Sequence, residues 1–88
     1  MRTGFAERFD KDANKINDAK ILDKIEEAIF NVKEARTMRD ISNLKKLKGY
    51  KIHYRIKIGK FRIGVTIEGD LVIFVRCLHR KDFYRHFP

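Results

Sequence analysis

The sequence predicts an α+β fold, in which an N-terminal helical hairpin packs on one face of a small, mainly antiparallel sheet. Apolar residues recur at intervals of three and four in the first part of the chain. They recur at intervals of two after residue 50. Intervals of three and four are typical of helices, and an interval of two is typical of strands. A chain of 88 residues can bury one hydrophobic core and no second one, so we expect a single domain over residues 1–88.

Two helices are predicted within residues 9–36, where the apolar side chains follow the helical period. The pair Asn17-Asp18 interrupts this pattern and divides it into a short helix and a longer one. Asp10 or Asp12 is expected to cap the first turn. The charged side chains of the longer helix fall outside its apolar stripe, so we interpret them as surface charges.

Three strands are predicted after a connector over residues 37–49. Alternation from residue 51 to 58 and from 61 to 67 indicates a β-hairpin, closed by the two-residue turn Gly59-Lys60. The near-continuous apolar run over residues 71–78 indicates a third strand in a more buried position.

The two-residue turn determines how the hairpin strands pair. Counting outward from it places Lys57 opposite Arg62 and Arg55 opposite Gly64. Like charges facing each other destabilise a sheet by under about 1 kcal/mol, and a bound anion would remove that cost. Gly64 would let another backbone approach this face closely. We therefore predict an anion site here, with a merely solvated face as the alternative; Arg76 joins it only if the third strand has the matching register.

The net charge of +9 belongs to the second half of the chain. Residues 1–44 carry nine basic and nine acidic side chains, whereas residues 45–88 carry twelve and three. No acidic residue occurs between Lys45 and Arg62. A block of one sign within a folded segment favours a polyanionic partner, nucleic acid before membrane, although solubility alone would also explain it.

The chain ends in a group of titratable and aromatic side chains. His79 could act as an acid or base near neutral pH, or it could be a satisfied side chain at a strand end. Arg80 could bind a phosphate, and Tyr84 could hydrogen-bond, stack, or belong to the core. Phe83 and Phe87 are interpreted as packing residues.

Cysteine and histidine usage exclude several kinds of site. The single cysteine, Cys77, excludes an internal disulfide and a cysteine-based zinc site. The three histidines lack the spacing of metal ligands, so we expect no metal and no other cofactor. No apolar run is long enough to span a membrane and the N-terminus lacks the apolar centre of a signal peptide, so a cytoplasmic location is expected.

Three segments together resemble the RelE/ParE superfamily of type II toxin–antitoxin toxins. They are Leu47-Lys48-Gly49, the stretch 54–63 (YRIKIGKFRI) and the stretch 79–84 (HRKDFY). With the helical hairpin, the resemblance covers almost the whole chain and is greatest to the RelE-like branch. It implies a microbial RNase-like fold with RNA bound opposite the helices. The N-terminal strand of the family is reduced here to residues 2–5, and it could end within residues 5–9.

The resemblance also implies an activity and partners. RelE-like toxins are ribosome-dependent endoribonucleases that cut mRNA and are silenced by an antitoxin, so a hetero-oligomer with a cognate antitoxin is expected. Arg62 matches the arginine that stabilises the scissile phosphate, and Arg80 a second one. Arg55 and Lys57 match strand bases that face the RNA, and Tyr84 matches a tyrosine near the cut. The bases expected to bind RNA are Lys48, Lys51, Arg55, Lys60, Arg76, Lys81 and Arg85.

Metal-independent RNA cleavage needs a base for the 2′-hydroxyl, an acid for the leaving 5′-oxygen, and cations near the phosphorus. Arg62 and Arg80 are the predicted cations. Lys57 or Tyr84 is expected to act near the 2′-hydroxyl, and His79 is the candidate acid. Some relatives use a glutamate as base, whereas the polar hairpin face here carries no carboxylate.

Three other functions are compatible with the sequence. A ParE-like toxin would share the fold but inhibit DNA gyrase without cutting nucleic acid. A non-enzymatic nucleic-acid binder would bind with steep salt dependence and show no cleavage. An inactive toxin relic would only bind its antitoxin.

Overall fold

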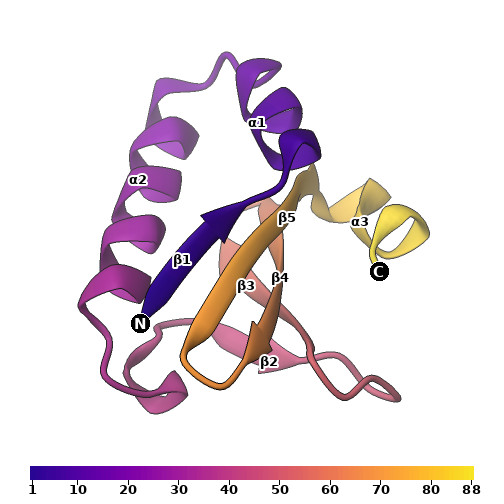
Figure 1. The fold of residues 1–88 in the computed structure, drawn as a ribbon. Coiled ribbons are helices and arrows are strands. Elements are labelled where there is room, and N and C mark those ends of the chain that lie inside the picture. Colours follow the sequence, from indigo (N-terminus) through magenta and orange to yellow (C-terminus); the bar gives the residue numbers. More distant parts are fainter.

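A five-stranded sheet with the order β1-β5-β4-β3-β2 forms the framework of the domain (Figure 1). The computed structural model describes all 88 residues. In chain order the elements are β1 (Arg2–Phe5), α1 (Glu7–Asn14), α2 (Ala19–Glu34), the 3₁₀ helix η1 (Met38–Asp40), β2 (Leu44–Lys46), β3 (His53–Ile58), β4 (Phe61–Glu68), β5 (Leu71–His79) and α3 (Arg80–His86). β1 runs parallel to β5, and the other neighbouring strands are antiparallel. The predicted α+β class is confirmed.

The main core lies between the first two helices and one face of the sheet. The helices contribute Phe9, Ile21, Ile25 and Val32, and the strands contribute Ile56, Ile58, Ile63, Val65, Ile67, Val72 and Phe74. These strand residues alternate along β3 and β4, so the residues between them point to the opposite face. The predicted packing of the helical pair on one face is confirmed. None of the helices is long and apolar enough to cross a membrane.

The break between the first two helices lies where the sequence predicts it. The carboxylate of Asp18 accepts hydrogen bonds from the backbone N–H groups of Lys20 and Ile21, at 2.9 and 3.4 Å, and so caps α2. The predicted cap of the first helix is wrong. Helix α1 begins at residue 7 with no side-chain cap, and both Asp10 and Asp12 lie inside it.

Both edges of the sheet differ in part from the expectation. β1 covers residues 2–5 as expected, but residues 7–9 belong to α1, so the strand does not extend to residue 9. The connector over residues 37–49 contains η1 and the strand β2, which adds to the edge of β3. This strand was not predicted because three residues are too few to display a period of two.

The pairing of the hairpin strands is confirmed residue by residue. Lys57 lies opposite Arg62, and Arg55 lies opposite Gly64. The turn between them is Gly59-Lys60, in which Gly59 has a φ of 61°. On its other side β4 pairs with β5, with an irregularity between Gly64 and Val65. The predicted third strand, β5, is therefore an inner strand between β1 and β4.

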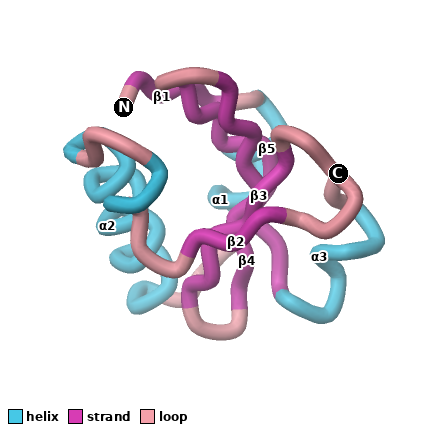
Figure 2. The backbone as a smooth tube through the Cα atoms, turned by 90° about the horizontal axis from the view of Figure 1, so that it is seen from below, coloured by secondary structure: helices cyan, strands magenta, loops and turns pink.

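A third helix, α3, which no helical period in the sequence indicates, covers part of the opposite face of the sheet. Figure 2 shows α2 and α3 on opposite sides of the strands. Phe83 and Phe87 are buried there against Leu47, with Val75 and Leu78 packed around them. Their interpretation as packing residues is confirmed.

The space left by Gly64 is filled from within the chain. A Cβ atom at Gly64 would lie 2.7 Å from Cγ of Phe87, so the aromatic ring rests directly on the glycine. The expectation that a second backbone approaches this position is therefore wrong. The C-terminal tail occupies it instead, and this contact helps to hold α3 on the sheet.

Replacing Gly64 with alanine is expected to lower the free energy of unfolding by about 1–3 kcal/mol, because the new methyl group must displace the Phe87 ring. Urea denaturation measures this. The double variant Gly64→Ala/Phe87→Leu should lose less than the sum of the two single variants, since the smaller side chain makes room. Strictly additive losses would contradict the contact.

Candidate functional site

Basic side chains gather on the sheet face opposite α1 and α2. Lys45 of β2 lies opposite Arg55 of β3, and two residues further along β3 Lys57 lies opposite Arg62 of β4. These four residues point away from the main core, because their neighbours Ile56, Ile58 and Ile63 are buried in it. We call Lys45, Arg55, Lys57 and Arg62 the basic sheet patch.

No acidic side chain forms an ion pair with the basic sheet patch. Nη1 of Arg55 donates to the carbonyl of Asn43 at 2.9 Å. Nη1 of Arg62 donates to the carbonyls of Gly59 and Phe61 at 2.8 and 2.9 Å. These bonds orient both guanidinium groups without neutralising them, and other N–H groups of each remain for a ligand. A phosphate is the kind of partner that such oriented guanidinium groups bind well.

The start of α3 brings Arg80 to the same end of the sheet. Its backbone N–H donates to the carbonyl of Lys60 at 2.8 Å, beside the hairpin turn that carries Arg62. Tyr84 follows four residues later on the same helical face and is 61% exposed, so it does not belong to the core. The structure thus brings together Lys57, Lys60, Arg62 and Arg80, with Tyr84 one turn further along α3.

His79 has a structural task at this end. Its Nδ1 accepts the backbone N–H of Lys81 at 3.1 Å and so caps α3, and its ring packs edge-on against Phe61. Because Nδ1 is occupied in accepting this hydrogen bond, it cannot also donate a proton to a leaving group while it caps the helix. The geometry therefore favours the satisfied strand-end role over the acid role.

Arg76, which is expected to bind RNA, instead forms a buried ion pair. Its Nε donates to Oδ2 of Asp12 at 2.8 Å and its Nη2 donates to Oδ1 at 3.2 Å. The side chains are only 14% and 9% exposed. The same carboxylate accepts the backbone N–H of Cys77 at 2.9 Å, where β5 extends beyond the end of β1. The guanidinium is thus used to attach α1 to β5, and we do not count it among the RNA-facing bases.

Other expected bases lie around the basic sheet patch. Lys48 and Lys51 are exposed in the loop that joins β2 to β3, and Lys81 is exposed on α3. Arg85 on the same helix forms an ion pair with Asp82 at 2.6 Å. Lys45 was overlooked as a site residue. Its position in an unbroken basic block was the available signal.

Cys77 offers no nucleophile near this surface. Its thiol is buried, and desolvation, aided by the nearby Asp12 carboxylate, raises its pKa to about 12. The thiolate, which is the reactive form, is therefore nearly absent at neutral pH.

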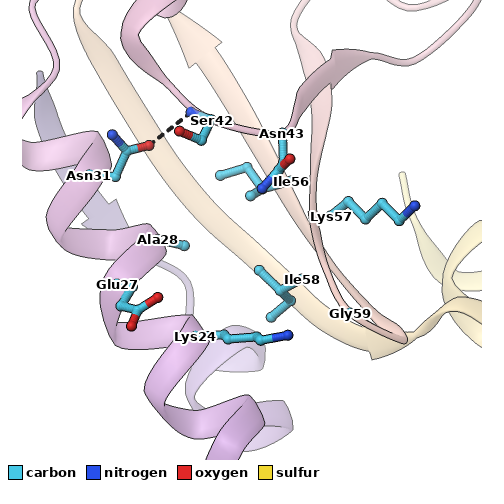
Figure 3. Close-up of a pocket in the computed structure, with 10 residues that line it drawn as sticks. All are labelled: Lys24, Glu27, Ala28, Asn31, Ser42, Asn43, Ile56, Lys57, Ile58 and Gly59. Carbon is cyan, nitrogen blue, oxygen red and sulfur yellow. Dashed lines mark hydrogen bonds between the residues drawn. The ribbon is translucent and has the colours of Figure 1, made fainter.

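A pocket of about 390 Å³ opens between α2 and the end of β3 that leads into the hairpin turn (Figure 3). Its walls include Lys24, Glu27, Asn31 and Ser42. The backbone N–H of Ser42 donates to the side-chain oxygen of Asn31 at 2.9 Å. The amine of Lys57 points away from the α2 side chains (Figure 3). The pocket and the basic sheet patch therefore share only Lys57.

Comparison with known families decides the class of protein. Residues 4–84 match the family model described as "ParE toxin of type II toxin-antitoxin system, parDE". The chain belongs to the RelE/ParE superfamily of toxins. It is 38% identical to "Toxin RelE3" of Methanocaldococcus jannaschii over the full length of both proteins.

Solved structures agree with this toxin's fold. The RelB-RelE antitoxin-toxin complex from Methanococcus jannaschii superimposes with a TM-score of 0.80 at 37% identity, covering 97% of this chain and 99% of that one. The intact Escherichia coli RelBE complex gives 0.69 at 20% identity over 89% and 94% of the two chains, which supports the fold alone. This toxin is thus RelE-like and belongs to the type II toxin–antitoxin class.

Proposed function

We propose that this toxin is a ribosome-dependent, metal-independent mRNA endoribonuclease that acts in the cytoplasm and is neutralised by a cognate antitoxin. The observation that carries the proposal is the uncompensated pair Lys57–Arg62 on the face opposite the helices. The proposal is supported by Arg80, whose backbone N–H bonds the carbonyl of Lys60 at the hairpin turn, and by Tyr84, which is exposed one helical turn later. The antitoxin follows from the likeness to RelE of the M. jannaschii RelB-RelE complex.

The proposed reaction is an attack of the 2′-oxygen on the adjacent phosphorus. A bond forms between these two atoms and the bond to the 5′-oxygen breaks, while a base takes the proton of the 2′-hydroxyl and the leaving oxygen takes a proton from water. Arg62 and Arg80 balance the negative charge that gathers on the phosphorane. Lys57 or Tyr84 is assigned to the 2′-hydroxyl side, and His79 is assigned to the helix cap.

Dependence on the ribosome is supported by the open shape of the site. The basic sheet patch is a surface of strands and is not part of the pocket walls apart from Lys57, so it does not enclose a nucleotide. Effective catalysis requires that the 2′-oxygen, phosphorus and leaving oxygen be held in line. A ribosome that presents mRNA in a fixed conformation would provide this alignment.

Expression of the toxin without an antitoxin should stop growth, and co-expression of the antitoxin should restore it. The purified chain should cut mRNA on programmed ribosomes and leave free mRNA intact. Because the matching family model is named for ParE, gyrase inhibition is the second candidate. A toxin that blocks gyrase supercoiling and cuts no mRNA on ribosomes would replace the proposal.

Replacing His79 with asparagine tests the cap assignment. An asparagine side chain can accept the Lys81 N–H, so the variant should cleave mRNA within about fivefold of the wild-type rate. His79→Ala, which removes the cap, should lower the stability of α3 in the same series. A loss of more than about 10²-fold in the asparagine variant would instead restore His79 as the general acid.

A further inference from the structure

Five aromatic rings form a row across the sheet face that carries α3. Tyr50 meets His53 with ring centroids 5.3 Å apart, His53 meets Phe87 at 5.6 Å, Phe87 meets Phe83 at 5.2 Å, and Phe83 meets Tyr84 at 4.9 Å. The middle of the row is buried or half-buried, while its two end members, Tyr50 and Tyr84, are 46% and 61% exposed. The row thus ends in an exposed tyrosine at each side, and only Tyr84 belongs to the proposed cleavage site.

Tyr50 lies in the loop 47–52, which joins β2 to β3 and extends away from the sheet (Figure 1). Gly49 turns the chain with a φ of 86°, and nothing lies within 4 Å of where its Cβ would be. The backbone N–H of Tyr50 donates to the carbonyl of Leu47 at 3.2 Å and closes the turn. A hollow of about 390 Å³ opens at the surface here, lined by Lys46, Leu47, Lys48, Gly49, Tyr50 and Lys51.

The electrostatic setting distinguishes Tyr50 from another exposed aromatic side chain. Phe30 on α2 is 65% exposed. Its helical neighbours at three and four residues are Glu26, Glu27, Lys33 and Glu34, so its surroundings are mainly acidic. Tyr50 is flanked by Lys48 and Lys51 in a stretch without any acidic residue. An exposed aromatic ring among bases is the arrangement that proteins use to hold unpaired nucleotides.

We propose that loop 47–52 is a second RNA-binding site, in which Tyr50 stacks on an unpaired base while Lys48 and Lys51 contact the neighbouring phosphates. This inference rests on the proposed RNA target. The contact of Tyr50 with His53, itself backed by Phe87, holds the ring in place, so little side-chain entropy is lost on stacking. Stacking does not distinguish base types, so the site recognises single-stranded RNA without sequence preference. The strand β2 connects it directly to Lys45 of the basic sheet patch.

The first experiment measures binding of the full chain to a fluorescent, unstructured RNA of about 12 nucleotides, and to a blunt duplex of the same length. Tyr50→Ala should weaken single-strand binding by about tenfold and leave duplex binding unchanged. Tyr50→Phe, which keeps the ring, should bind like wild type. Phe30→Ala is the matched control for loss of an exposed aromatic side chain, and it should also bind like wild type.

A second arm uses ribosomes without mRNA in a pelleting assay, because the unpaired base could belong to the message or to ribosomal RNA. Loss of ribosome binding by Tyr50→Ala assigns the unpaired base to ribosomal RNA, and a loss confined to the free oligonucleotide assigns it to the message. Unchanged binding in both arms would overturn the inference. So would an equal loss of single-strand and duplex binding, or a phenylalanine variant as weak as alanine.

The lysines are tested through salt. Lys48→Ala and Lys51→Ala should each reduce the slope of log Kd against log salt concentration by about 0.7, the contribution of one phosphate contact on a single strand. Lys20→Ala, which removes an exposed lysine on α2, should leave the slope unchanged. The cleavage proposal is tested separately, because binding through loop 47–52 does not depend on whether the toxin cuts mRNA. A chain that binds through Tyr50 but never cuts mRNA would keep the second site and lose the nuclease assignment.

Discussion

Replacing Arg62 with alanine is expected to lower the rate of mRNA cleavage on programmed ribosomes by about 10²- to 10³-fold. The guanidinium group is oriented by the carbonyls of Gly59 and Phe61, so it needs no rearrangement when charge develops on the phosphorane. A preorganised donor of this kind stabilises the transition state more than the ground state. The change should therefore appear in the cleavage rate and only weakly in the affinity for ribosomes.

Two companion variants separate charge from geometry. Arg62→Lys keeps the charge but replaces the planar guanidinium, which has five donors in a fixed arrangement, with a compact ammonium, so it should recover only part of the rate. Arg2→Ala removes an exposed arginine that pairs with Asp70 at the far end of the sheet, and cleavage should stay at the wild-type rate. Single-turnover cleavage measures all three.

The Arg62 variant must also be shown to be folded. Because Arg62 binds the hairpin turn, its removal should lower the free energy of unfolding by about 1–3 kcal/mol, and urea denaturation gives this value. A folded Arg62→Ala protein that cleaves like wild type would show that the basic sheet patch is not the cleavage site.

The hairpin could be predicted from the sequence because its information is local. A two-residue turn leaves one register, and alternating side chains then decide which face each residue occupies. This placed Lys57 opposite Arg62 without knowledge of any other strand. The break at Asn17-Asp18 was equally local, since Asp18 caps the helix that follows it.

The features that were missed depend on distant partners or on very short elements. Helix α3 has seven residues, too few for a helical period, and it is stabilised by Phe83 packing against Leu47, far away in the sequence. Phe87 reaches Gly64 in the same way. Only the folded chain brings these residues together, so no spacing rule could have found them.

Arg76 of the candidate site was also misjudged from the sequence because its role depends on a distant partner. Its strand is predicted correctly, and Arg76 lies directly opposite Gly64, which is the register that would let it join the anion site, but its guanidinium is already paired with Asp12. Its partner Asp12 is 64 residues away. The charge of a residue could be read from the sequence, but whether another side chain already neutralises it could not.

Replacing Asp12 with alanine is expected to lower the free energy of unfolding by about 3–5 kcal/mol. The variant leaves the Arg76 guanidinium, only 14% exposed, without a counter-ion, and it also leaves the backbone N–H of Cys77 without its acceptor. Thermal and urea denaturation measure the loss. Asp70→Ala, which breaks the exposed ion pair with Arg2, is the matched control and should change stability little.

The double variant Asp12→Ala/Arg76→Met decides between an unpaired buried charge and a general loss of packing. Removing both charges should recover much of the stability lost by Asp12→Ala, because the methionine fills the space without needing a counter-ion. A double variant no more stable than Asp12→Ala would contradict this explanation.

The same protein also tests the reassignment of Arg76. If the guanidinium serves only to attach α1 to β5, the folded double variant should bind RNA and cleave mRNA like wild type, whereas a folded but inactive protein would return Arg76 to the RNA-binding residues.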